Sequence, residues 1–154
     1  MADITVDITI SLVSYSTWLR SSYFSTSLVG ADGSPLIDTN EFGPDQEDAF
    51  QNFMQEASRE LLKVFLSRQG DVTGDAFEQD GTSIKYRVNE ATPVLPQSSA
   101  IKASLNEDVK NALFVYVSYL WLKMKKQDDY ALYMLERYHK LTKDINVHLY
   151  KLHD

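Results

Sequence analysis

The residues of this chain that are best suited to acid–base chemistry are its three histidines, His139, His148 and His153, which all lie near the C-terminus. Asp144 precedes His148 by four residues, so on a helix the carboxylate and the imidazole would share one face and the carboxylate could orient the ring. The sequence contains no Gly-x-Ser-x-Gly elbow that would supply a serine nucleophile. A partly buried histidine beside a carboxylate explains the pair more simply, so we predict no catalytic residues and no enzymatic activity.

Metal and cofactor sites have equally little support. Segment 38–43 places oxygen-bearing side chains at the first and third positions of a calcium loop and Gly43 at the sixth, but Phe42 and Ala49 occupy the fifth and twelfth positions, where ligands are needed. A turn that leads into a helix explains these residues. The chain has no phosphate-binding glycine motif. Because it has no cysteine, disulfides, Cys-ligated zinc and thiol catalysis are excluded. We predict no metal and no cofactor.

The charge of the chain argues against a dedicated nucleic-acid binder. Its 154 residues carry a formal net charge of −7, whereas phosphate contacts need clustered Lys and Arg. The charge is uneven: residues 1–100 hold 15 acidic and 6 basic side chains, and residues 101–154 hold 7 and 9. Lys123, Lys125 and Lys126 lie close together. They form either a solvated turn or an electrostatic rim that meets an acidic partner or passing DNA.

The elements that must position these residues follow from the hydrophobic periodicity, which predicts a mainly α fold: a small helical bundle with a C-terminal helical hairpin and a short β-hairpin excursion. With 44% hydrophobic residues, the chain is expected to form one domain, and we expect it to be soluble and intracellular. The expected parts of this single domain, 1–154, are an N-terminal strand, helix and loop (1–44), a helix (45–69), a β-hairpin (75–90) and a helical hairpin (104–154).

In the N-terminal part, strict alternation predicts a strand at 4–10, while 11–26 is either a helix or a second strand. In the C-terminal part, Ser104 and Glu107 match a capping box, which predicts a helix start near Leu105 and an end near residue 127. Asp128 is expected to cap the final helix. The β-hairpin is expected to pair 76–79 with 82–89.

The aromatic residues, 12% of the chain, are the strongest remaining signal. The middle of the first hairpin helix is apolar nearly all round, so it must be covered on every side. The cover could be a good core or a neighbouring subunit, because Tyr and Trp are favoured in interface cores. In the second case Tyr116, Tyr119 and Trp121 are the expected subunit contacts. An alternative is a small helical adaptor or regulatory module that binds a partner peptide in an aromatic groove.

The order of these elements and their aromatic–aliphatic pattern resemble those of tailed-bacteriophage head–tail connector proteins, also called adaptor or neck-ring proteins. The resemblance covers about residues 45–154 and rests on helix order and an aromatic–aliphatic pattern with a short Asp-rich turn. No part of it matches the strand at 4–10. The residues that carry it are Asp45 in the acidic cap of the first long helix and, in the hairpin, Asp108, Ala112, Phe114, Tyr116, Tyr119, Trp121, Asp128, Asp129, Tyr130, Tyr133 and Tyr138.

The resemblance implies a virion protein, made in the host cytoplasm, that sits in the neck between capsid and tail. Its members form a ring, typically of twelve copies, below the portal vertex, with the portal protein and other neck or tail proteins as partners. DNA passes through the lumen without sequence-specific binding, and no membrane or cofactor is involved. The C-terminal segment would contact the portal, which here implies a role for Ile145, Leu149, Tyr150 and Leu152.

Overall fold

The computed structural model describes residues 2–9, 11–21, 44–69, 83–90 and 98–153. The fold is mainly α, with four α-helices packed as a bundle and one two-stranded sheet. The described elements are β1 (Ala2–Thr9), α1 (Leu12–Ser21), the 3-10 turn η1 (Pro44–Gln46), α4 (Glu47–Gln69), β2 (Ser83–Glu90), α5 (Ser98–Met124) and α6 (Asp128–His153). None of the described helices is long and apolar enough to cross a membrane.

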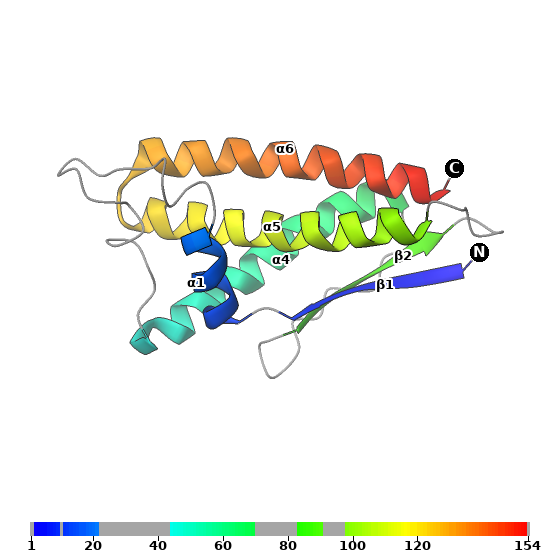
Figure 1. The fold of residues 1–154 in the computed structure, drawn as a ribbon. Helices are drawn as coiled ribbons and strands as arrows, with labels where there is room; N and C mark the ends of the chain where they lie inside the picture. Colours follow the sequence, from blue (N-terminus) through cyan, green and yellow to red (C-terminus); the bar gives the residue numbers. More distant parts are fainter. Residues whose placement is uncertain (1, 10, 22–43, 70–82, 91–97, 154) are drawn as a thin grey trace.

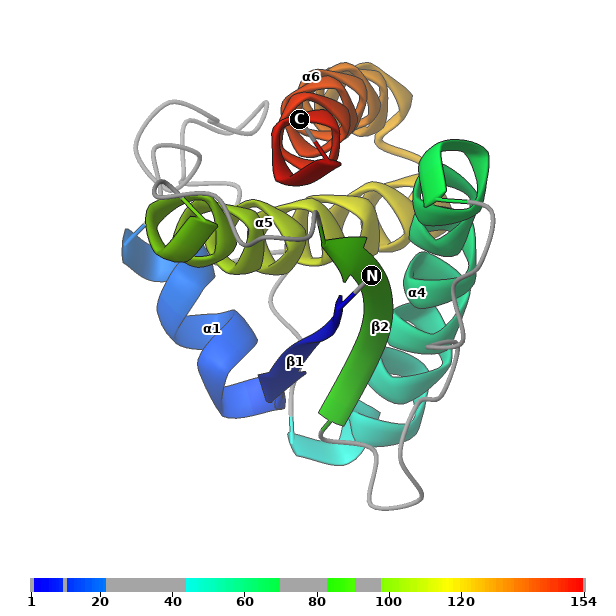
Figure 2. The same cartoon turned by 90° about the vertical axis from the view of Figure 1, so that its right-hand side faces the viewer.

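Helix α5 is the centre of the molecule. Figure 2, which views the molecule from one end, shows α6 above α5, the sheet below it, and α1 and α4 on its two sides. This arrangement explains why α5 lacks a polar face in its middle: its own chain covers most of its circumference, while Tyr116 and Tyr119 stay half-buried. Helix α1 is fixed to α5 by two hydrogen bonds, Tyr15 Oη with Ser118 Oγ at 2.7 Å and Trp18 Nε1 to Asn111 Oδ1 at 3.1 Å.

The sheet joins two segments that are far apart in the sequence. β1 pairs antiparallel with β2, and the register places Ile4 opposite Val88, Val6 opposite Tyr86 and Ile8 opposite Ile84. Apolar positions of one strand are therefore paired with apolar positions of the other, a match that a shift of one residue would lose. Both strands were predicted, but their pairing was not. The first arm of the predicted β-hairpin, 76–79, lies outside the described residues, and the partner that the structure gives β2 is the N-terminal strand.

The first residues of both helices of the hairpin differ from the prediction. α5 begins at Ser98 instead of near Leu105, because Ile101, Leu105 and Val109 recur at four-residue spacing and are all buried, so the apolar stripe starts earlier. Ser104 is therefore an exposed residue inside the helix, and the capping-box interpretation was wrong. Asp128 is the first residue of α6, and the carbonyl that accepts from Ala131 N at 2.9 Å belongs to Gln127, which takes the cap position.

The remaining helix predictions agree better with the structure. The predicted helix 45–69 corresponds to η1 and α4, with the acidic residues Asp45, Glu47 and Asp48 in the first turns, where the helix dipole favours them. For 11–26, which the sequence left open between helix and strand, the structure shows helix α1; residues 22–26 lie outside the described part.

The turn between α5 and α6 is tight and has one unusual residue. Gln127 N donates to Leu122 O at 2.9 Å and Lys126 N donates to Lys123 O at 3.1 Å, which is the pattern of a Schellman motif. This motif needs a left-handed residue at its centre, and Lys126 adopts it with φ 59°. Glycine is the usual residue here because it has no Cβ to clash. The chain thus accepts backbone strain at the tip of the hairpin.

Candidate functional site

Of the three aromatic residues predicted as subunit contacts, Trp121 belongs to the core. Its side chain is 2% exposed and packs edge-on against Phe53, with ring centroids 6.2 Å apart. A subunit contact would need an exposed side chain at Trp121. The ring is instead covered by α4 within a single protomer. Tyr116 and Tyr119 are only half-buried, so their rings still reach the surface.

Tyr116 and Tyr119 belong to a tyrosine cluster on the side of α5 that faces α4. The ring centroid of Tyr116 lies 5.4 Å from that of Tyr119 and 4.8 Å from that of Tyr138 on α6. Burial, followed by the negative charges of Glu60 and Glu56, raises the pKa of Tyr116 to about 12. Burial and Glu60 also raise the pKa of Tyr138 well above its usual range. The cluster is thus an uncharged aromatic surface next to two carboxylates of α4.

The three lysines of the predicted electrostatic rim are all exposed at the tip of the α5–α6 hairpin. The Lys123 ammonium lies 5.7 Å from the centroid of the Tyr119 ring and 3.5 Å from its hydroxyl oxygen, and the Lys125 ammonium lies 4.8 Å from the centroid of the Trp121 ring. Two of the lysines therefore cover aromatic rings of their own chain with favourable cation–π geometry. Their charges remain at the surface, available to solvent or to a partner.

The residues predicted to contact a portal protein divide into two groups. Ile145 and Leu149 are fully buried and belong to the hydrophobic core, so in this structure their side chains are not available to a portal protein. Both are covered because α6 packs along the whole of α5 and also against α4 and β2 (Figure 1). Tyr150 is 53% exposed and remains accessible. The side chain of Leu152 lies outside the described part.

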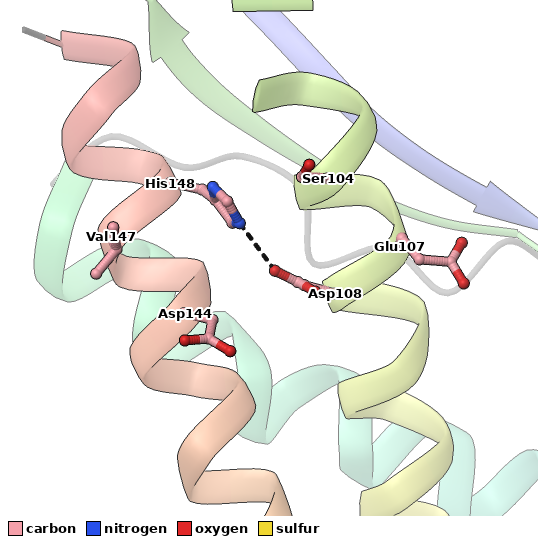
Figure 3. A pocket seen from close by; sticks show the side chains of 6 residues that line it. All are labelled: Ser104, Glu107, Asp108, Asp144, Val147 and His148. Carbon is pink, nitrogen blue, oxygen red and sulfur yellow. Dashed lines mark ion pairs between the residues drawn. The ribbon is translucent and has the colours of Figure 1, made fainter. Parts of the chain in front are cut away.

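The chemically most distinctive feature lies between the two hairpin helices near their open end. His148 Nε2 on α6 is 3.0 Å from Asp108 Oδ2 on α5, and both side chains are 22% exposed. They line an open pocket of about 390 Å³ together with Ser104, Glu107, Asp144 and Val147. Figure 3 shows the imidazole pointing across the gap toward Asp108. Asp144, the partner predicted from helical spacing, lines the same pocket, but the ion pair of His148 is with Asp108.

Sequence reasoning missed Asp108 because it looked for a partner along one helix. In an antiparallel helical hairpin, residues at similar distances from the turn on either helix face each other, and Asp108 and His148 satisfy this condition around the turn at Lys126. The sequence signal was thus the register of the hairpin, which follows once its two helices and turn are placed.

The pocket is electrostatically mixed. Burial raises the pKa of Asp108; the nearby His148 opposes this shift, and the negative charges of Asp144 and Glu107 add to it. His148 Nδ1 is buried and has no hydrogen-bond partner. Within the described residues, Ser104 makes no hydrogen bond to His148, the contact that would activate a serine nucleophile, and no three His, Asp or Glu side chains are arranged to hold a metal ion. The arrangement is suited to holding two helices together.

Comparisons of the chain with protein-family models, with curated proteins and with solved structures found no match. Its function is therefore inferred from its own residues and from the resemblance in helix order. The features available for that inference are the tyrosine cluster, the lysines of the hairpin tip, the exposed part of α6 and the His148–Asp108 pair.

Proposed function

We propose that this chain is a structural assembly protein, most specifically a head–tail connector or neck-ring subunit of a tailed phage, which works by binding other protein chains without turnover. The observation that carries the proposal is the long antiparallel hairpin of α5 and α6, closed by a short turn that ends in Asp128 and Asp129 and preceded by α4 and β2. This is the element order on which the resemblance rests.

The surface that supports the proposal differs from the one expected from sequence. Tyr116 and Tyr119, with rings that reach the surface, are the aromatic contacts for a neighbouring copy, since Trp121 is enclosed. On α6, Leu132 and Tyr150 are 56% and 53% exposed. They are separated by five helical turns and so lie on one line along the outward face of α6. Tyr150 stays the proposed portal contact, because Ile145 and Leu149 are enclosed.

Charge distribution favours a neighbouring copy as the first partner. The N-terminal 100 residues carry a large acidic excess and the C-terminal 54 a small basic one, so two different surfaces of one chain attract each other. Exposed acidic side chains gather in η1, at Asp45, and in the first half of α4, at Glu47, Asp48 and Glu56, while the lysines lie at the hairpin tip. Contact between two different surfaces is heterologous, which closes into a ring when the rotation permits.

The proposal assigns each surface of the chain a partner in the neck. The hairpin tip of one copy meets the acidic part of the next, the C-terminal end of α6 meets the portal, and DNA passes through the lumen. The acidic excess suits this role, because like charge keeps the lumen from gripping the DNA backbone. No catalytic turnover and no cofactor are part of the proposal.

The proposal is tested by light scattering and native mass spectrometry of the purified chain over a wide range of concentrations, alone and with the portal ring of the same phage. We expect self-association or portal-dependent ring formation that weakens as salt is added. The triple variant Lys123→Glu, Lys125→Glu, Lys126→Glu should lose it. The matched control Lys140→Glu, Lys143→Glu, Lys151→Glu, which changes three exposed lysines of α6, should retain it. A chain that stays monomeric at every concentration and with the portal present overturns the proposal.

A further inference from the structure

The open end of the α5–α6 hairpin is held by a polar contact between the two helices. His148 lies near the C-terminal end of α6, and its Nε2 is 3.0 Å from Asp108 Oδ2 in the first half of α5. Figure 1 places this end of the hairpin at the opposite side of the molecule from the turn. The turn fixes one end of the helix pair covalently, so the ion pair acts where the two helices are free to separate.

The groups around His148 are mostly acidic. Asp108 faces it from α5 and Asp144 lies one turn before it on α6, whereas Glu107, which also lines the pocket, points away from it (Figure 3). Glu107 also contacts Lys110 at 3.3 Å, on the exposed side of α5. Lys151, one turn after His148, is exposed and does not line the pocket.

The other two elements that pack against α6 add no described charge at this pair. On α4, Glu60 acts on Tyr116 and Tyr138, further along the helix pair. On β2, the buried Tyr86 donates its hydroxyl hydrogen to Ser58 O at 2.7 Å. The described charged groups that line the pocket with His148 are thus carboxylates.

We propose that the His148–Asp108 pair is a proton-controlled latch: the protonated imidazole holds the end of α6 against α5, and loss of the proton loosens the last turns of α6 and uncovers Ile145 and Leu149. Histidine is the side chain whose ordinary titration falls between pH 5 and 8. This inference goes beyond the proposed function, because it concerns the chain itself, whatever the chain assembles with.

The physical basis is the difference between a charged and a neutral hydrogen bond. A protonated imidazole donates to the Asp108 carboxylate in a charge-assisted bond, which is about twice as strong as the neutral bond that remains after deprotonation. Deprotonation also leaves Asp108 and Asp144 without the positive charge of the imidazolium in the pocket. The effect is modest, because the protonated ring carries a second N–H, at the buried Nδ1, that has no acceptor.

What the latch controls is visible from the burial of its neighbours. Ile145 and Leu149 flank His148 on α6 and are both fully buried. Their amides lie in the same helical turns as His148, so local opening of the end of α6 exposes both side chains together. Uncovering them creates an apolar strip at the C-terminal end of a helix, next to the exposed Tyr150.

The test is native-state amide hydrogen exchange at about pH 6 and about pH 8, on either side of the ordinary histidine pKa, corrected for the intrinsic rate. We expect the protection of amides 145–151 to be about fivefold lower at the higher pH, relative to amides 112–118 in the middle of α5, as a difference of about 1 kcal/mol between the two hydrogen bonds implies. Equal relative protection at the two pH values overturns the proposal. Because the readout lies within one chain, it does not depend on ring formation.

Variants assign the effect to the pair. His148→Gln should remove the pH dependence of amides 145–151, whereas the matched control His139→Gln, at an exposed position of the same helix, should keep it. Asp108→Asn, which keeps the shape of the side chain and removes its charge, should lower the protection at about pH 6 and reduce the pH dependence. A pH dependence that persists in His148→Gln, or that is as large in Asp108→Asn as in the unchanged chain, shows that another group is responsible and overturns the latch.

Discussion

The position of Trp121 decides between a core and an interface role for the aromatic residues of α5, and the variant Trp121→Ala separates the two. The ring is 2% exposed, so nearly all of its surface, about 150–250 Å² for a buried aromatic side chain, is withdrawn from water by its own chain. Truncation of such a residue to alanine costs about 3–5 kcal/mol, from lost transfer free energy and the cavity left between α4 and α5. This is a large share of the about 5–15 kcal/mol by which domains are stable.

The assay is urea and thermal unfolding followed by circular dichroism, with Trp18 as a remaining fluorescence probe. In a chain of this length a loss of 3–5 kcal/mol corresponds to a fall in Tm of about 6–20 °C. Tyr119→Ala, two residues away and half-buried, is the matched control and should cost about 1 kcal/mol. Trp121→Phe keeps most of the volume and provides a folded variant if Trp121→Ala does not fold.

The opposite outcome would assign Trp121 to an interface. If Trp121→Ala keeps the midpoint and slope of the unfolding curve and instead loses self-association, the ring is exposed in the free chain and buried only by a partner. That result would refute the account of α5 as a helix covered by its own protomer.

Two further predictions concern the hairpin turn and the tyrosine cluster. Lys126→Gly should raise the unfolding free energy by about 0.5–1 kcal/mol in urea titrations, because φ 59° strains a residue with a Cβ, whereas Lys126→Ala should give no gain. The raised pKa values of Tyr116, to about 12, and of Tyr138 mean that their stabilising contribution is complete below about pH 10, where unfolded tyrosines begin to ionise, and is lost as the pH rises toward about 12. Circular dichroism should show this alkaline loss, and Tyr138→Phe should reduce it; a stability independent of pH in this window would contradict the burial of the cluster.

Sequence periodicity predicted elements well where it was regular. The alternation of Ile4, Val6 and Ile8 marked β1, the acidic cap marked the start of α4, and the apolar stripe of α6 marked its full length. Local signals were less reliable at boundaries. The Ser104 and Glu107 pair fits a capping box but lies inside α5, because burial of Ile101 extends the helix beyond it.

Long-range partners were the features that sequence reasoning could not supply. The pairing of β1 with β2 depends on how distant elements stack, which no local pattern encodes, whereas the pairing of His148 with Asp108 needed the register of the helical hairpin in addition to the pattern along one helix. The coverage of Trp121 has the same origin: its ring lies against Phe53 of α4, and a count of aromatic residues cannot tell whether one chain has enough surface to enclose them.

The pairing of the first strand with a strand near the middle of the chain also sets the order in which the protein forms on the ribosome. Ala2 lies opposite Glu90, so β1 cannot complete its ladder until the residues of β2 have been synthesised. Until then β1 presents an open, apolar edge, the kind of segment that invites pairing with another nascent chain. Closing so long a loop is slow, whereas α5 and α6 adjoin in sequence and meet quickly. The α5–α6 hairpin is therefore expected to form before the β1–β2 ladder.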